Sequence, residues 1–272
     1  MRKNKLSFLD FLWLGREQWI TCPHPLARVF IRWLGPLGIH TRIRSAHILQ
    51  VIEKLPLPPK ARVLDAGCGH AYASFWLARH HTDWEIWGVD INAEIIKQNQ
   101  RAAYILGLRN LHFQVGDVTA LNISVPYDLL FSIDVLEHLR DDVGALSSWR
   151  QAINQNGWLV LHVPLRHQMQ KRIFPAFRHH TVSDHLRDEY TEDEIKTKLR
   201  QAGFVLLSTT YGFGTWGELA FELNYLFWQQ PWLRTVFALL TFPIANIAGY
   251  IDSQFVPDHG NSLILLAQIA LP

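Results

Sequence analysis

The sequence has only two cysteines, Cys22 and Cys68, among its 272 residues. Two cysteines cannot build the disulfide framework that holds small secreted domains together, so the fold must rest on a hydrophobic core. Charged residues are also sparse, at 18%, and a net charge of +2 is too small to indicate nucleic acid as a partner. Apolar residues make up 49% of the chain, which excludes intrinsic disorder. This length and composition predict one large domain or two small ones.

The N-terminus lacks a convincing secretory signal. Met1–Lys5 is basic and Leu6–Leu14 is apolar, but Asp10 interrupts the apolar run and no small-residue cleavage site follows. With so few cysteines and no export signal, we expect a cytoplasmic protein.

Residues 1–60 are predicted to form a basic helical segment. They hold ten Lys and Arg against three Asp and Glu, a net charge of +7. Apolar residues recur at helical spacing from Leu26 to Leu37, with Arg28 and Arg32 on another face. Prolines between 56 and 59 then break the chain and predict a boundary.

Residues 61–212 alternate between strand and helix patterns. Strands are expected at 62–65, 85–90, 111–116, 127–134, 158–163 and 204–210, and helices at 70–81, 93–106, 136–154 and 191–202. Thr191 and Glu194 form a capping box for the last of these helices, and Gly203 ends it. Such alternation predicts an α/β fold with a doubly wound, Rossmann-like parallel sheet.

The C-terminal part departs from this alternation. Residues 213–257 are aromatic, apolar and helical in pattern, so they read as a helical insertion before a final strand at 261–271. That strand brings the number of strands in the predicted sheet to seven. The expected organisation is an N-terminal helical segment (1–60), a core (61–212), the insertion (213–257) and the final core strand (258–272).

A glycine-rich turn follows the first predicted strand, at Val63–Tyr72 (VLDAGCGHAY). Small residues let a backbone approach a ligand, and the start of a helix offers free N–H groups. A dinucleotide site would place glycine or alanine at the third position of the motif, where Tyr72 would crowd a pyrophosphate. Asp65, just before the first glycine, is unexplained by that hypothesis. Cys68 is interpreted as a small filler of the turn, because no base or positive charge is apparent to activate its thiol.

The motifs of this region together resemble the class I S-adenosylmethionine-dependent methyltransferases. Leu64–Gly69 is similar to the glycine motif of that family, with Ala71 where the family often has a further glycine. Trp87–Asp90, Gly116–Val118 and Tyr127–Ser132 follow in family order. The resemblance covers about residues 61–212 and the last strand.

The resemblance implies S-adenosylmethionine as the cofactor. Asp90 would hold the ribose hydroxyls, since a carboxylate accepts from both at once, and Asp117 would meet the adenine amine. The cofactor-binding residues implied are Asp65, Gly67, Gly69, Asp90, Ile91, Asp117, Val118 and Ser132. Ligands of open α/β sheets bind at the carboxyl ends of strands, where these residues are expected. The alternative is that these acids are ordinary surface turn residues. That alternative explains a single acid more easily than four acids at the ends of successive strands.

His138 is the candidate general base. It follows the fourth predicted strand, where the family places the methyl group, and histidine is the most frequent general base in enzymes. The alternative is that it only shapes the pocket. Asp134, Glu137 and His138 also form a D-x-x-E-H pattern, similar to the metal-binding E-x-x-E-H of some quinone and small-RNA methyltransferases, with His162, His179 or His180 as a fourth ligand. The preferred interpretation has no metal, with Glu137 capping a helix and Asp134 facing the cofactor.

Two further segments bear on the acceptor. Residues 165–189 form a basic loop that could cover an anionic substrate group, or be a solvated connection. Residues 235–251 carry no charge, at the lower limit for a membrane span, but Glu218 and Glu222 precede them and penalise a second crossing. Helices that roof the pocket or lie in a membrane interface are therefore expected, with internal packing or a homodimer contact as alternatives.

The predicted function is methyl transfer to the oxygen or carbon of a small, hydrophobic or lipid-like acceptor, with peripheral membrane contact. The first alternative is a methyltransferase-fold binding protein without activity. The second is a nucleic-acid methyltransferase, against which Ser132–Val135 shows no N-P-P-Y-like tetrad. We expect no nucleic-acid partner.

Overall fold

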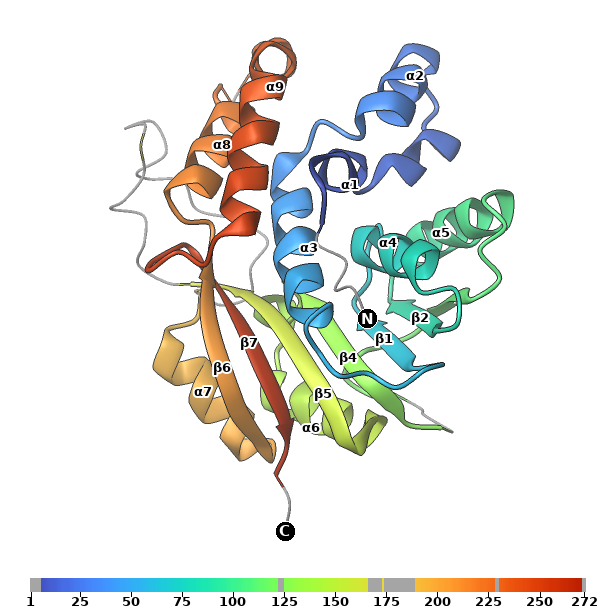
Figure 1. The fold of residues 1–272 in the computed structure, drawn as a ribbon, viewed down its shortest axis with the longest axis vertical. Coiled ribbons are helices and arrows are strands. Elements are labelled where there is room, and N and C mark those ends of the chain that lie inside the picture. The colour runs from blue at the N-terminus through green and yellow to red at the C-terminus, as the bar shows by residue number, and fades with distance from the viewer. Residues whose placement is uncertain (1–5, 122–124, 166–172, 174–188, 228–229, 271–272) are drawn as a thin grey trace.

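The computed structural model describes residues 6–121, 125–165, 173, 189–227 and 230–270. These form a seven-stranded sheet in the order β3-β2-β1-β4-β5-β7-β6, with helices on both faces (Figure 1). The strands are β1 (Arg62–Ala66), β2 (Glu85–Asp90), β3 (Leu111–Val115), β4 (Tyr127–Ile133), β5 (Ile153–Pro164), β6 (Phe204–Gly212) and β7 (Ser262–Ile269). The predicted doubly wound, Rossmann-like fold class is confirmed.

The sheet is mixed, since β7 runs antiparallel to both β5 and β6 while the other pairs are parallel. The reason lies in the insertion, where α8 (Thr215–Tyr225) and α9 (Pro231–Gln254) form a helical hairpin. The hairpin leaves the sheet after Gly212 and returns beside it, so that Ser262 pairs with Gly212. A chain that re-enters a sheet at the end it left must run backwards.

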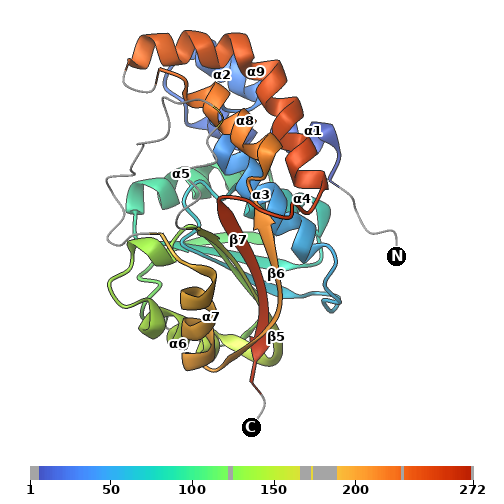
Figure 2. The same cartoon turned by 90° about the vertical axis from the view of Figure 1, so that its left-hand side faces the viewer.

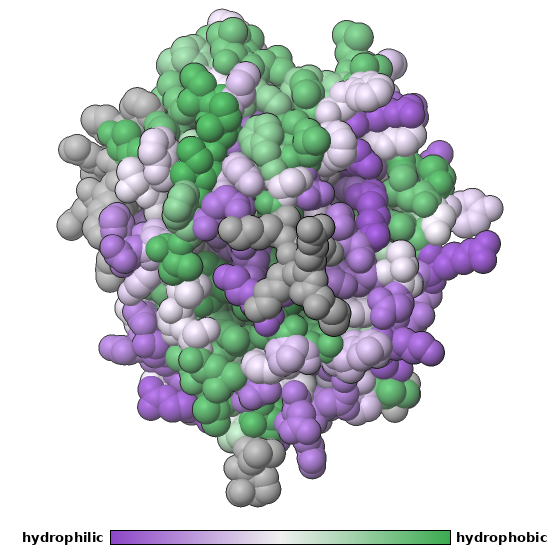
Figure 3. All heavy atoms as spheres, in the orientation of Figure 1, coloured by the Kyte–Doolittle hydropathy of each residue, from purple (hydrophilic) through white to green (hydrophobic). Residues whose placement is uncertain are grey.

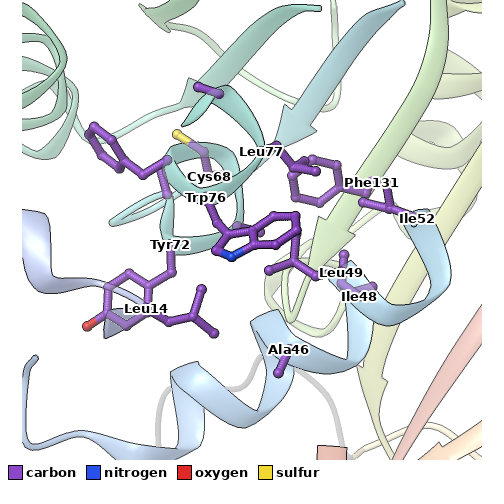
Figure 4. Packing of buried hydrophobic residues seen from close by; sticks show 14 of the residues in the cluster. Leu14, Ala46, Ile48, Leu49, Ile52, Cys68, Tyr72, Trp76, Leu77 and Phe131 are labelled. Carbon is purple, nitrogen blue, oxygen red and sulfur yellow. The ribbon is translucent and has the colours of Figure 1, made fainter. Parts of the chain in front are cut away.

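Both faces of the sheet are buried, which explains the near-continuous apolar runs of its central strands. One core cluster lies under α4 (Tyr72–His80) and α5 (Ala93–Ile105), together with α3 (Ile39–Ile52). The other lies under α6 (Asp142–Ala152) and α7 (Glu192–Gln201). Neighbouring residues of a strand alternate between the clusters, as Phe131 and Leu130 do. Figure 4 shows α3 contributing Ile48, Leu49 and Ile52 to the first cluster.

The N-terminal segment contains α1 (Phe8–Trp13), the 3-10 helix η1 (Arg16–Ile20), α2 (Pro25–Leu34) and α3. The predicted helices are confirmed, but they differ in depth. Most of α3 is buried beside the sheet, whereas α2 has no buried residue. Figure 2 shows α9 crossing the end of the molecule opposite the C-terminus, with α2 behind it.

The helix expected over residues 136–154 is wrong in its extent. The chain forms a short 3-10 helix, η2 (Leu136–His138), then extends at Leu139 before α6 begins. Asp141 caps α6 by accepting a hydrogen bond from the Gly144 amide at 2.8 Å, and α6 ends where β5 starts at Ile153. The capping box of α7 is confirmed, with both Thr191–Glu194 hydrogen bonds present.

Candidate active site

The glycine turn joins β1 to α4 and brings backbone amides to the carboxyl end of the sheet. The amides of Gly67 and Cys68 donate to the Val89 carbonyl at 2.8 and 3.0 Å. Gly67 has φ +76°, and a Cβ there would lie 2.4 Å from Val135 Cγ2. Gly69 has φ +46°, but the space that its Cβ would enter is open, with no described atom within 4 Å. Protein atoms thus fill the space beside Gly67, whereas the space beside Gly69 is open.

Asp90, at the end of β2, holds this turn against the next helix. One carboxylate oxygen accepts from the Gly69 amide at 2.8 Å and the other from the Asn92 amide at 2.9 Å. Asn99 on α5 donates to the Gly69 carbonyl at 2.7 Å, so both sides of Gly69 are fixed. A carboxylate has lone pairs beyond these two bonds, and these remain able to accept from hydroxyl groups.

Three of the predicted cofactor residues are buried. Asp65 is buried and accepts from the Ser74 hydroxyl at 2.6 Å; burial raises its pKa to about 7, against the lowering effect of that bond. The buried Ser132 hydroxyl donates to the Ala66 carbonyl at 2.7 Å. Val118 is buried, and its carbonyl accepts from the Trp149 indole at 2.8 Å. These side chains support the walls of the site.

Ile91 and Asp117 lie at its rim instead. Ile91 is 75% exposed, which is unusual for isoleucine and leaves an apolar surface beside Asp90. Asp117 is exposed, and its carboxylate accepts from the Thr119 amide at 2.8 Å and the Thr119 hydroxyl at 2.7 Å. Those two bonds lower the pKa of Asp117, so it is an acceptor at neutral pH.

Asp134, directly after β4, is held by two groups from distant parts of the chain. Its carboxylate contacts Arg44 of α3 at 2.7 Å and the His162 Nδ1 atom of β5 at 2.5 Å. Burial opposes its ionisation, but Arg44 and His162 outweigh burial and hold the pKa of Asp134 well below its ordinary range. Its φ of +50° is a left-handed conformation that non-glycine residues rarely adopt. Such strain is typical of functional sites.

Glu137 lies fully buried in η2, and neither carboxylate oxygen has a hydrogen-bond partner among the described residues. Burial, followed by the negative charge of Asp134, raises its pKa well above the ordinary value. The next residue, His138, is half-buried and lies at the surface of the same turn.

Helices α3 and α8 cover this region with aromatic and histidine side chains. His40 Nδ1 and the Tyr225 hydroxyl lie 2.6 Å apart, and burial lowers the pKa of His40 to about 3, which keeps its ring neutral. His47 lies 3.1 Å from Asp252 of α9 and stacks on His162, with ring centroids 6.4 Å apart. Phe213 contacts the rings of both His47 and His162. The side chains that cover the contacts of Asp134 with Arg44 and His162 are therefore mainly aromatic.

Asp134, one of the residues of the metal hypothesis, has other partners in the structure. Asp134 is engaged by Arg44 and His162, and the described residues contain no group of three or more His, Cys, Asp and Glu that could hold a metal ion. His179, His180 and nearly all of the basic loop at 165–189 lie outside the described residues. Of that loop, Ile173 is described, and its amide donates to Glu222 of α8 at 2.8 Å.

The role of Arg44 is not predicted by the sequence. His162 is predicted only as a fourth ligand of the metal alternative, and no local pattern connects α3 with β4 and β5. Arg44 lies among polar residues such as Arg42 and Ser45, so no local signal marks it.

A family model described as a methyltransferase domain matches residues 40–209. The chain belongs to this methyltransferase domain family. Membership confirms the predicted resemblance to the class I S-adenosylmethionine-dependent methyltransferases, and S-adenosylmethionine as the cofactor of a domain of this class. The match includes most of α3, so the helix that carries Arg44 is part of the domain.

Known relatives of this methyltransferase domain differ in what they do. The trans-aconitate 2-methyltransferase of Deinococcus radiodurans is 28% identical over 170 residues, 62% of this chain and 57% of that one. The chain spans about half the length of the curated relatives it matches. Among solved structures, the cyclase SpnF has a TM-score of 0.60 at 19% identity, covering 88% and 84% of the two chains. The magnesium protoporphyrin IX methyltransferase of Synechocystis PCC 6803, with bound SAH, has a TM-score of 0.54 at 19% identity, covering 94% and 93%. These structures establish the shared fold.

Proposed function

We propose that this protein transfers a methyl group from S-adenosylmethionine to a small, hydrophobic or lipid-like acceptor, at oxygen or carbon, in the cytoplasm. The observation that carries the proposal is the open position at Gly69, whose amide is fixed by Asp90 at the carboxyl ends of β1 and β2. Open space beside a carboxylate that can still accept from hydroxyl groups suits a ligand with a ribose. Ligands of open α/β sheets bind at this edge.

The residues around this turn fit the cofactor. Asp90 would accept from the ribose hydroxyls, and the exposed Asp117 would accept from the adenine amine. The exposed Ile91 would cover one face of the adenine ring. Asp65, Gly67, Val118 and Ser132 would hold the shape of the turn and its walls. When bound, S-adenosylmethionine supplies an electrophilic methyl group on a sulfonium.

His138 is assigned as the general base that takes a proton from the acceptor. Its neighbour Glu137 is fully buried, and burial raises the pKa of that carboxyl, which disfavours its ionised form. Asp134 holds His162 and Arg44 beneath the acceptor space through direct contacts with both side chains. Positioning of this kind accounts for most of the acceleration expected of a methyl transfer.

The covering side chains support a hydrophobic acceptor. Phe213, Phe221 and Tyr225 form successive ring contacts above the polar contacts of Asp134. The rings of Phe221 and Tyr225 are stacked, with their centroids 4.8 Å apart. An aromatic wall with few polar groups is typical of sites for small organic ligands. The curated relative acts on trans-aconitate, an anionic acceptor, and the aromatic wall favours a less polar one here.

The test is to titrate the purified protein with S-adenosylmethionine and S-adenosylhomocysteine by calorimetry, and then to screen extracted lipids, quinones and phenolic metabolites with a labelled methyl donor. Binding of either ligand raises thermal stability by mass action. Ligand binding without transfer to any acceptor class would favour the binding-protein alternative, which the fold permits, since fold does not determine activity. Transfer to RNA or DNA would favour the nucleic-acid alternative.

A further inference from the structure

The outer face of α2 is apolar and uncovered. None of its residues is buried, and Leu26, Val29 and Trp33 lie along it at helical spacing. Leu26 is 88% exposed. A stripe of this kind normally faces a core. On α2 it faces outward.

The outer face of α9 is similar. Trp232, Leu240 and Ile244 are exposed, while Ala245 and Ala248 pack inward against the domain. Leu240 is 70% exposed. Figure 3 shows hydrophobic side chains gathered at the end of the molecule where α9 lies. We call Leu26, Val29, Trp33, Trp232, Leu240 and Ile244 the α2–α9 surface.

A ring contact and the hydrogen bonds of Arg42 connect the two helices. The rings of Phe30 on α2 and Phe242 on α9 meet edge to face at 5.3 Å. The buried guanidinium of Arg42 donates to the Leu34 carbonyl at 3.0 Å, and also to the Pro36 carbonyl and to Asn246 of α9. The end of α2 is therefore tied to the middle of α9 through α3.

The exposed charged residues of α2 and α9 are all positive. Arg28 and Arg32 of α2 are exposed and lie over the Trp19 ring, and Arg234 is exposed on α9. Helix α2 contains no acidic residue, and Asp252, the one acid of α9, is buried against His47. Tryptophan beside exposed arginine and a broad apolar face is the composition of helices that lie in a membrane interface.

We infer that the α2–α9 surface docks on an anionic lipid bilayer, with both helices lying in its interface. Residues Trp232–Gln254 form one helix long and apolar enough to cross a membrane, but its inner face packs on α3 and α8 and carries Asn246 and Asp252. A crossing would pull those polar groups away from their partners and into hydrocarbon. Lying flat keeps every one of those contacts.

The membrane also serves as the source of the acceptor, and this part rests on the proposed function. Helix α8 carries Phe221 and Tyr225 over the candidate site and packs along α9. A lipid-like molecule that leaves the bilayer beside α9 thus meets the aromatic wall of the site without crossing water.

The test is flotation of the full chain with vesicles of phosphatidylglycerol and phosphatidylcholine, compared with phosphatidylcholine alone. We expect flotation with the anionic vesicles, at least about tenfold stronger than with neutral ones, because each arginine near such a surface strengthens binding about fivefold. Salt should weaken it and leave a remainder due to apolar insertion. Arg28→Glu with Arg32→Glu should remove most of the salt-sensitive part, and Leu26→Ser, Trp33→Ser and Leu240→Ser should remove most of the remainder. Extraction by alkaline carbonate should release the protein.

Two control variants match these changes elsewhere on the surface. Lys97→Glu with Arg101→Glu reverses the same number of exposed charges on α5, and Val205→Ser with Leu207→Ser removes exposed apolar side chains from β6. Both should float as the parent does. S-adenosylhomocysteine titration of every variant separates the two proposals, since binding without flotation overturns the membrane inference alone. Resistance to carbonate, or a dimer in light scattering that the α2–α9 substitutions dissociate, would also overturn it.

Discussion

The Oδ1 atom of Asp134 lies 2.5 Å from the Nδ1 atom of His162, so the ends of two adjacent strands share one hydrogen bond beneath the candidate site. Arg44 completes it from α3. The contact ties the N-terminal segment to the core at the place where the proposed chemistry occurs.

Arg44→Met should destabilise the protein, because it leaves the buried Asp134 charge with one partner fewer. We expect a loss of about 3 kcal/mol in urea unfolding at neutral pH, and less when Asp134→Asn is combined with it, since no charge is then left unpaired. The pKa of Asp134 is depressed in the folded state, so its contribution is present above its ordinary pKa and is lost as the pH falls below it. Arg101→Met on the exposed face of α5 is the control and should change stability by less than about 0.5 kcal/mol.

Gly67→Ala and Gly69→Ala form a matched pair in the glycine turn. Both residues have positive φ, and Ala71 in the same turn shows that alanine tolerates φ +54° there. Gly67→Ala should lose about 2 kcal/mol or more of stability, because its Cβ meets Val135. Gly69→Ala should fold with about 1 kcal/mol of strain yet bind S-adenosylhomocysteine at least about tenfold more weakly, since the new methyl group occupies the open space. Equal affinities for the two variants would argue against a cofactor beside Gly69.

Asp90→Ala removes the acceptor of the Gly69 and Asn92 amides. We expect a loss of about 1–2 kcal/mol of stability, and an affinity for S-adenosylmethionine reduced by about tenfold to a hundredfold in calorimetry. Asp83→Ala is the control, since Asp83 also accepts a backbone amide, that of Lys60 at 3.3 Å, before β2 begins. The control should leave affinity unchanged.

His138→Ala should lower turnover by about a hundredfold or more while leaving cofactor affinity as it is, because general-base catalysis acts on the acceptor. Glu137→Gln keeps the shape of a carboxyl whose ionised form is disfavoured by burial, so turnover near neutral pH should change by less than about threefold. Turnover is followed with the labelled methyl donor, with and without a chelator. Loss of activity on chelation, restored by Mg²⁺, Mn²⁺ or Zn²⁺, would revive the metal hypothesis for Asp134, Glu137 and His138.

Asp65 should make the protein less stable as the pH rises from about 4 to 7. Burial raises its folded-state pKa to about 7, so the folded protein binds a proton that the unfolded chain releases, and the free energy of unfolding falls across that interval. Asp65→Asn keeps an acceptor for the Ser74 hydroxyl and removes the titration. Denaturant unfolding at a series of pH values should show a flatter profile for this variant than for the parent, and parallel profiles would contradict the assignment.

Local signals in the sequence determined much of the fold. Helix α7 begins at the capping box of Thr191 and Glu194, and Gly203 follows it with φ +82°, because caps and left-handed glycines act over a few residues. The glycine turn was predicted for the same reason. The helix expected over 136–154 was wrong, because Asp134 and Leu139 take backbone conformations that a helical apolar pattern cannot report.

The sequence by itself determined the elements, the family and the edge of the sheet where the site residues lie, since strand ends and turn residues are local properties. Only the tertiary structure decided which distant residues meet there: Arg44 and His162 reach Asp134 because α3 packs across β4 and β5. It also decided that the apolar stripe of α2 faces outward. Periodicity predicts that a helix has an apolar face, but what covers that face depends on the position of every other element, and here Leu26, Val29 and Trp33 stay exposed.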